Sequence, residues 1–416
     1  MALSEQQIQT LGREALQRAA AGDFAGAEAG FARIVDERPN GGQALHLLGQ
    51  IRLKLGRFAD AREPLERAAK FLPREATAQT NLAGCLMQLG QYEPALEALA
   101  RAARLKPNDP AIAHNTGRAL EALGRAEEAE RAYDLALSLD NRLLPSLSAR
   151  AALLAARGEW AGALADLDTA LVSRPSDPQL RLRRGELLLR QGDWWRGLAD
   201  HEARLELPGE RYAPSLPRWQ GEPLDGRLLI FPEQVDIESE AAMRDVAMLA
   251  RVEGVVQCPP ALAGFNGFVA APTISRGEPL DGFAAAAPLR SLPHLLGWSL
   301  DALPPPVALK AQAEPSLRIG WFSRREPPAG LDVERDTTRV ASCRLVVGDD
   351  TWPTHLAASL GIRTLFLLPR IADWLWGPRL ETSPQKTPWY ASAELLHDED
   401  GALRDGEKLA ARLAGC

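Results

Sequence analysis

Residues 76–109 read ATAQTNLAGCLMQLGQYEPALEALARAARLKPND, and similar stretches recur along the N-terminal half of the chain. Sliding the sequence against itself by 34 residues aligns six glycines: Gly22, Gly56, Gly90, Gly124, Gly158 and Gly192. A fixed period of this length indicates an array of small structural units rather than one globular core.

Three other positions repeat with the same period. A small residue follows each glycine by five positions: Ala27, Ala61, Ala95, Ala129, Ala163 and Gly197. A large residue comes four positions later, at Phe31, Leu65, Leu99, Tyr133 and Leu167. A proline closes four of the units, at Pro39, Pro73, Pro107 and Pro175.

Each repeated residue type has a mechanical reason in a pair of packed helices. Glycine ends the first helix at low cost, because it adopts left-handed backbone conformations without a Cβ clash. The small residue lets two helices cross closely. Proline ends the second helix because it drives the preceding residue out of the α region. One hairpin cannot bury its apolar face alone, so we expect the units to stack into a superhelix with a groove.

These positions resemble the tetratricopeptide repeat family over about residues 8–205. The resemblance implies that the first helix of each unit lines a groove that binds another polypeptide. The residues expected to line it are His46, Asn81, His114, Asn115 and Arg118. Ordinary surface histidines are the alternative for His46 and His114.

Asn81 and Asn115 occupy the same place in consecutive units. In O-GlcNAc transferase, which the chain resembles in domain order, a ladder of asparagines at that place holds the backbone of extended protein substrates. An asparagine amide both donates and accepts hydrogen bonds, so it suits a peptide backbone of any sequence. Two polar residues on a solvated face are the alternative.

The repeat ends near Trp195, and residues 206–227 read as a linker rich in proline and glycine. Beyond it, apolar runs predict four buried strands, at 228–231, 317–322, 344–347 and 364–368. A short helix at 353–360 joins the last two into a parallel strand–helix–strand unit with a right-handed crossover. We therefore expect a fold of class α plus α/β, with a repeat superhelix (1–205), a linker (206–227) and an α/β domain (228–416).

The turn at 348–352 predicts an anion-binding site. Ligands of open α/β sheets bind at the carboxyl ends of strands, and a helix N-terminus favours phosphate. Thr351 offers a hydroxyl and His355 a ring N–H to such an anion, whereas Asp349 and Asp350 would repel it if both faced it. A turn that only caps the helix would look similar.

A second resemblance covers most of residues 215–392. Asp350-Thr351, His355-Leu356-Ala357 and Leu360-Gly361 resemble the DTxxxHLAxxLG motif of bacterial glycosyltransferases that carry tetratricopeptide repeats. Leu367-Leu368-Pro369, Asp373-Trp374, Trp376 and Pro388-Trp389-Tyr390 resemble that family's aromatic ending. These enzymes are similar to the heptosyltransferase and O-GlcNAc transferase group, whose GT-B fold has two Rossmann domains. The resemblance implies a reduced Rossmann-like domain in which Asp350, Thr351 and His355 hold the donor diphosphate.

Two departures from that family bear on activity. Its glycine-rich EQGLGD turn becomes Glu233-Gln234 followed by residues 235–238 without glycine, although Asp236 or Glu238 could serve as a general base. The segment between 322 and 344 is also shorter than in the family. Arg324 and Arg325 are candidates to replace its positive charge, with a solvated pair as the alternative, and Trp374 and Trp376 complete the candidate donor site.

Composition narrows the function classes. The net charge of −7 argues against a general nucleic-acid binder. The N-terminus has no apolar secretory core and no apolar run is long enough to span a bilayer, so we expect a cytoplasmic location. The cysteines show no CxxC spacing. We expect no metal and no permanently bound cofactor, only a nucleotide-sugar donor.

Two functions remain open. The first is a protein O-glycosyltransferase, whose repeats recruit an acceptor of the flagellin type and whose C-terminal domain transfers a nucleotide-activated sugar. The second is a non-catalytic scaffold, whose glycosyltransferase-like domain has become a pseudoenzyme. The retained Thr351 and His355 favour the first function. The lost glycine turn and the shortened core favour the second.

Overall fold

The structure is a computed structural model of the 416-residue chain. It describes residues 3–209, 213–231, 254–258, 272–275, 277–297, 319–323, 327, 333–335, 337–349, 351–360, 362–368, 385–386, 390 and 392–398. The chain divides into two compact units, residues 1–174 and 175–416. The division falls after the fifth helical hairpin, so the sixth predicted repeat lies in the second unit.

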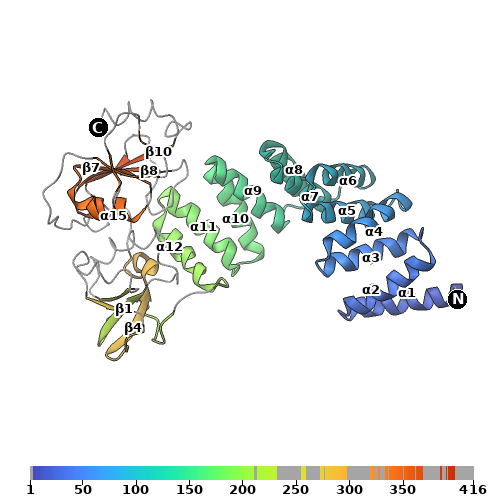
Figure 1. Ribbon diagram of the computed structural model, residues 1–416, viewed down its shortest axis with the longest axis horizontal. Coiled ribbons are helices and arrows are strands. Elements are labelled where there is room, and N and C mark those ends of the chain that lie inside the picture. Colours follow the sequence, from blue (N-terminus) through green and yellow to red (C-terminus); the bar gives the residue numbers. More distant parts are fainter. Residues whose placement is uncertain are drawn as a thin grey trace. The chain divides into compact units, whose positions relative to one another are not determined.

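The first unit consists of five helical hairpins. The helices are α1 (Glu5–Ala20), α2 (Phe24–Glu37), α3 (Gly42–Lys54), α4 (Phe58–Phe71), α5 (Ala76–Gln88), α6 (Tyr92–Leu105), α7 (Pro110–Ala122), α8 (Ala126–Leu139), α9 (Leu144–Arg157) and α10 (Trp160–Ser173). Each helix packs against the next one along the chain, and Figure 1 shows the hairpins following one another from blue to green. The predicted helical repeat array is confirmed.

The repeated residues act as the sequence predicts. The glycine after each first helix has a positive φ, from +72° at Gly56 to +88° at Gly192. At Gly56 a Cβ would meet nothing within 4 Å, so the backbone conformation and not a lack of space calls for glycine there. Ala61, Ala95 and Ala129 are fully buried, as close helix crossings require.

The first helices of successive helical hairpins lie in one layer. Helix α3 contacts α5, α5 contacts α7, and α7 contacts α9, and we call these four helices the first-helix layer. Side chains also join its members: Asn81 Nδ2 is 2.7 Å from His46 Nε2, and His114 Nδ1 is 3.0 Å from the Ser146 hydroxyl. The layer therefore carries polar side chains between neighbouring repeats.

The second unit contains two sheets. One has strands β1 (Arg227–Phe231), β2 (Val255–Cys258), β3 (Thr273–Ser275) and β4 (Phe283–Pro288), all parallel, in the order β3-β2-β1-β4. The other has β5 (Ile319–Phe322), β6 (Val333–Glu334), β7 (Leu345–Gly348), β8 (Arg363–Leu368), β9 (Gln385–Lys386) and β10 (Ala393–His397), in the order β6-β5-β7-β8-β10-β9. Only β9 pairs antiparallel among these described strands.

The second unit also holds the sixth hairpin, α11 (Pro178–Gln191) and α12 (Trp194–His201), followed by a 3₁₀ helix, η1 (Glu202–Glu206). Leu189, Trp194 and Leu198 share one apolar cluster with residues of both sheets, including Ile230 and Phe366. The hairpin therefore supplies part of the core on which the strands pack.

A buried polar network reinforces this packing. The Arg204 guanidinium, only 6% exposed, donates to Glu202 at 2.6 Å and to the Ser291 hydroxyl at 2.8 Å. Ser291 in turn donates to Glu202 at 2.9 Å. Each buried charge thus has a partner, which lowers the cost of removing it from water. Burial beside Arg204 lowers the pKa of His201 to about 3, so its ring is neutral near pH 7.

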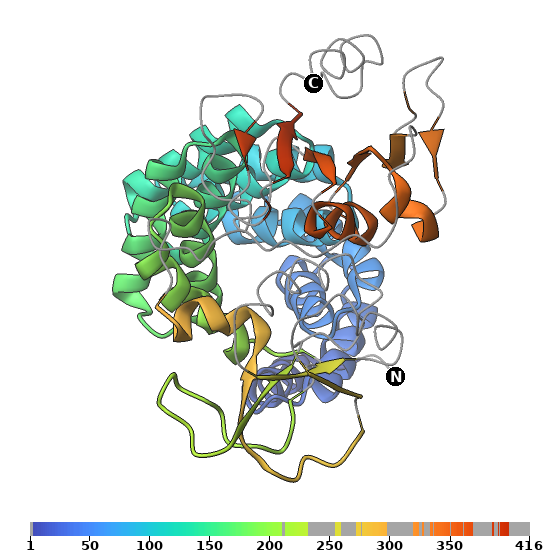
Figure 2. The same ribbon diagram turned by 90° about the vertical axis from the view of Figure 1, so that its left-hand side faces the viewer.

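The predicted strand–helix–strand unit is confirmed in outline. β7 and β8 are parallel neighbours, and α15 (Trp352–Ser359) lies between them in sequence and packs against both (Figures 1 and 2). The four predicted strands correspond to β1, β5, β7 and β8. The other six described strands were not predicted. The chain thus has a helical N-terminal part and a C-terminal region with parallel sheets, whereas the assignment of that region to a Rossmann-like or GT-B fold stays a prediction.

Candidate functional site

Two of the predicted groove residues, His46 and Asn81, hydrogen-bond to each other. His46 is 7% exposed, and burial lowers the pKa of its ring. Because the Asn81 amide nitrogen can only donate, His46 Nε2 accepts this hydrogen bond and must be unprotonated. His46 is therefore neither an ordinary surface histidine nor an open ligand contact. Its ring fixes the Asn81 amide between α3 and α5.

His114 on α7, two repeats after His46, has a similar setting. Its ring contacts Ser146 and lies 5.7 Å from the Tyr133 ring, centroid to centroid. Burial and then the neighbouring Arg118 charge lower the pKa of His114 to about 4. The ring is thus neutral near pH 7 and contributes packing and a hydrogen bond to the first-helix layer.

Asn115 and Arg118 are the predicted groove residues whose polar groups remain available. Asn115 is half-buried and Arg118 is exposed, and they lie three residues apart on α7, so they share one face. Within the described part of the chain, neither side chain has a hydrogen-bond or ion-pair partner. An amide and a guanidinium together offer seven donors and one carbonyl acceptor, by side-chain chemistry. Such groups can bind a peptide backbone or a carboxylate.

The turn before α15 is closely packed. Thr351 lies directly before the helix, and its carbonyl oxygen accepts from the backbone N–H groups of Thr354 and His355, both at 3.1 Å. Its hydroxyl lies 3.2 Å from the Thr354 hydroxyl. A Cβ on Gly348 would come within 2.2 Å of the Thr354 hydroxyl oxygen, so the turn has room only for glycine there. The two carbonyl bonds form the first turn of α15, and the anion site beside Thr351 stays a prediction.

The ends of β5 and β7 meet beside this turn. The Ser323 hydroxyl donates to the Asp349 carboxylate at 3.0 Å. The strand order reverses between β5 and β7, because β6 lies on one side of β5 and all later strands lie on the other. Crevices outside the carboxyl ends of strands at such a reversal are usual ligand sites in open α/β sheets. The carboxylate of Asp349 gives the crevice between β5 and β7 a negative charge.

The expected exposure of His355 is wrong. Its side chain is fully buried, and its Nδ1 lies 3.0 Å from the Tyr390 hydroxyl. The ring packs 4.9 Å from that of Phe366 on β8, centroid to centroid. Because α15 turns this position toward the sheet, His355 does not offer a ring N–H to an anion beside Thr351. Its place is in the core.

The remaining predicted site residues lie outside the described residues. They are Asp236, Glu238, Arg324, Arg325, Asp350, Trp374 and Trp376. No helix in the described ranges is long and apolar enough to cross a membrane. No cluster of three or more His, Cys, Asp or Glu side chains in those same ranges could hold a metal ion.

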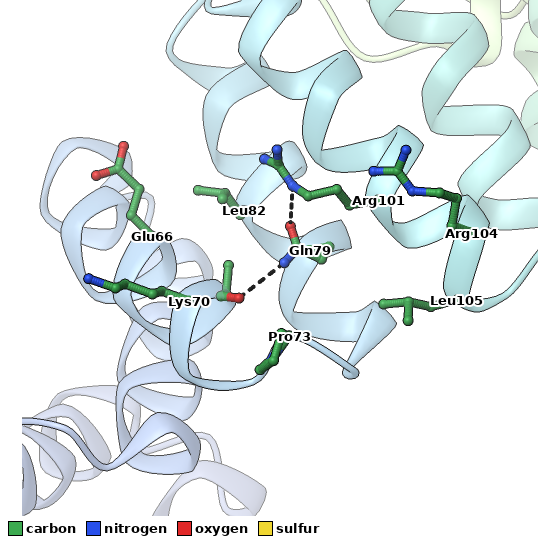
Figure 3. Close-up of a pocket in the computed structure, with 9 residues that line it drawn as sticks. Glu66, Lys70, Pro73, Gln79, Leu82, Arg101, Arg104 and Leu105 are labelled. Atoms are coloured by element: carbon green, nitrogen blue, oxygen red, sulfur yellow. Dashed lines mark hydrogen bonds between the residues drawn. The ribbon is translucent and has the colours of Figure 1, made fainter.

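Sequence reasoning missed a pocket between α4 and α6 (Figure 3). Its floor carries Gln79, which is 4% exposed. The sequence did contain a signal for the pocket, because the other four repeats of the first compact unit have an apolar residue at the place of Gln79: Leu11, Leu45, Ala113 and Leu147. A polar residue at an apolar repeat position marks a local requirement beyond the fold.

Comparisons with known proteins concern the helical part. The tetratricopeptide repeat family matches residues 13–76, 52–110, 81–146 and 148–207. A search of curated proteins finds no match. Among solved structures, TTC0263, a thermophilic TPR protein of Thermus thermophilus, is 29% identical, with 44% of this chain and 99% of that chain covered and a TM-score of 0.37.

Two further structures cover similar shares of this chain. Pseudomonas aeruginosa PilF is 17% identical, with 48% of this chain and 87% of that chain covered and a TM-score of 0.41. YrrB, a TPR protein with an unusual peptide-binding site, is 20% identical, with 41% and 87% covered and a TM-score of 0.36. The family match coincides with the helical hairpins and their repeated glycines. The N-terminal part of this chain consists of tetratricopeptide repeats.

Proposed function

We propose that the chain is a protein-binding scaffold that holds an extended segment of a client protein on the first-helix layer. Tetratricopeptide repeats are modules of protein–protein interaction. The observation that carries the proposal is the pair Asn115 and Arg118, whose polar groups have no partner among the described residues. Polar side chains that can bind a peptide backbone, repeated along a layer of helices, suit a client in extended conformation.

Asn81 supports the same surface from the neighbouring repeat. Its amide nitrogen is committed to His46, which leaves its carbonyl oxygen to accept from a client N–H. The equivalent Asn115 has both its amide N–H donors and its carbonyl acceptor available. The two amides repeat with the helices, so they can bind successive stretches of one extended chain, while Arg118 would bind a carbonyl or carboxylate of that chain.

Affinity purification with the full chain tests this proposal. The first-helix variant combines Asn81→Ala, Asn115→Ala and Arg118→Ala, and the control variant combines Glu127→Ala and Arg131→Ala on α8. A hydrogen bond contributes about 0.5–1.5 kcal/mol, and more when one group is charged. We therefore expect the first-helix variant to bind the purified client at least about tenfold more weakly.

The control variant should bind that client as the unchanged protein does. Equal loss in both variants, or none in either, would refute the assignment of the client to the first-helix layer. Circular dichroism of each variant shows whether the helices are retained.

Transfer of a sugar from a nucleotide-sugar to the client is the second candidate. The reversal of strand order between β5 and β7 favours it, because a ligand crevice is expected there. The Asp349 charge and the enclosure of His355 count against a diphosphate at that place, so the scaffold is the better supported function.

Thermal unfolding separates the two candidates. A donor site should raise the melting temperature of the full chain in millimolar nucleoside diphosphate or nucleotide-sugar, since a ligand of the folded state stabilises it. Thr351→Val should abolish that rise. A scaffold without a donor site should show no rise with any of these nucleotides.

A further inference from the structure

The pocket between α4 and α6 has a volume of about 590 Å³. It lies between the second helices of two consecutive repeats, with α5 beneath it (Figure 3). Leu82, Leu105 and Pro73 supply apolar lining. It is thus separate from Asn115 and Arg118 on the first-helix layer.

The buried amide of Gln79 organises the floor of the pocket. Its Nε2 donates to the Ala69 carbonyl at 3.1 Å, and its Oε1 accepts from Arg101 Nε at 3.1 Å. The Ala69 carbonyl needs such a partner because Pro73, four residues later, has no N–H to complete the helix. Gln79 thereby fixes the Arg101 side chain over the pocket floor.

The charge of the pocket is positive. Lys70, Arg101 and Arg104 line it, against a single carboxylate, Glu66. Arg62 binds that carboxylate at 2.7 Å. Arg101 Nη1 lies 3.9 Å from Glu97 in an exposed pair, which is worth little. For Lys70 and Arg104, the described residues provide no ion pair at all.

Helix dipoles explain only part of this charge. Lys70 and Arg104 lie in the last turns of α4 and α6, where cations are favourable. That role does not account for Arg101, one turn earlier, or for the buried Gln79 that holds it. The repeat supplies an arginine at the place of Arg101, since Arg33 and Arg67 occupy it in the two preceding repeats, but it does not account for Gln79, because the next repeat has Ala113 there.

We propose that this pocket binds an acidic side chain of a partner peptide. Arg101 and Arg104 lie three residues apart on one face of α6 and project above Gln79 (Figure 3). Their guanidinium groups match a carboxylate in charge and in hydrogen-bonding geometry. An apolar neighbour of that carboxylate would rest on Leu82 and Leu105. The pocket shares α5 with the first-helix layer, but Asn81, Asn115 and Arg118 do not line it, so either proposal can fail without the other.

Fluorescence anisotropy on the full chain tests the pocket with two labelled, end-capped hexapeptides. One alternates leucine and glutamate, and the other replaces each glutamate with glutamine. We expect the glutamate peptide to bind at least tenfold more tightly than the glutamine peptide, and to weaken as salt is raised. The same affinity for both peptides, or no binding of either, would overturn the proposal.

Three variants locate the binding. The double variant Arg101→Gln with Arg104→Gln should bind the glutamate peptide at least tenfold more weakly. Gln79→Leu, which installs the leucine of the preceding repeat, should weaken binding of the glutamate peptide severalfold by releasing Arg101. Arg131→Gln on α8 removes an exposed charge elsewhere and should leave the affinity within twofold. Unchanged affinity in the double variant, or an equal loss in Arg131→Gln, would show that the pocket is not the site.

Discussion

Gly117 tests whether the repeats pack as described. It lies in the middle of α7, opposite Tyr133 of α8, and a Cβ at this glycine would come 2.5 Å from Tyr133 Cε1 and 2.7 Å from Cδ1. The ring cannot move aside easily, because it is fully buried and its hydroxyl donates to Glu121 at 2.8 Å. Overpacking of this kind costs about 1–3 kcal/mol, whereas glycine to alanine in a helix normally gains about 1 kcal/mol.

Gly117→Ala should therefore lower the free energy of unfolding by about 1 kcal/mol, against the helix propensity. Gly84→Ala is the matched control, since that glycine also lies mid-helix and a Cβ there would meet nothing within 4 Å. Urea unfolding of the full chain, followed by circular dichroism, compares the two. Tyr133→Leu, which installs the leucine of neighbouring units, should restore stability to Gly117→Ala. Equal stabilisation by Gly117→Ala and Gly84→Ala would refute the packing.

Three further predictions concern other parts of the chain. Burial lowers the pKa of His114 to about 4, so as pH falls from 6.5 toward 4 only the unfolded chain protonates this ring, and the free energy of unfolding decreases over that range. His114→Gln should flatten a plot of urea midpoint against pH between those two values. Arg150→Ala leaves the buried carboxylate of Asp166, which Arg150 binds at 2.6 Å, without this ion-pair partner. It should lower the free energy of unfolding in urea by about 3 kcal/mol, and adding Asp166→Ala should recover part of that loss. Tyr390→Phe removes the hydrogen bond to His355 and should cost about 1 kcal/mol, seen as faster hydrogen exchange in α15 and β8, whereas unaltered exchange would contradict the buried contact.

The repeats were predictable because their constraints are local. A glycine that must adopt a positive φ and a small residue at a helix crossing are each determined by neighbours within one hairpin. The same causes act every 34 residues, so they are visible in the sequence as a period. The strand–helix–strand unit around α15 was predictable for a related reason, since β7 and β8 are short apolar runs that flank one turn-bounded helix.

The sites were less predictable because they depend on residues far apart in sequence. His355 is enclosed by Tyr390, 35 residues later, and a motif read along the chain cannot show that contact. His46 and Asn81 likewise become partners only once two repeats stack. β4 was missed because its central residues are alanines, which have weak strand preference. It forms by pairing with β1 in the core.

The central claim is that a client lies along the first-helix layer, and site-specific photo-crosslinking tests it most directly. A photo-crosslinking residue is placed in the full chain instead of Asn115, and in a second version instead of Arg131 on α8. We expect the Asn115 position to crosslink to one continuous segment of the client and the Arg131 position to give no such product. Crosslinks from Arg131 but not from Asn115, or equally from both, would contradict the account.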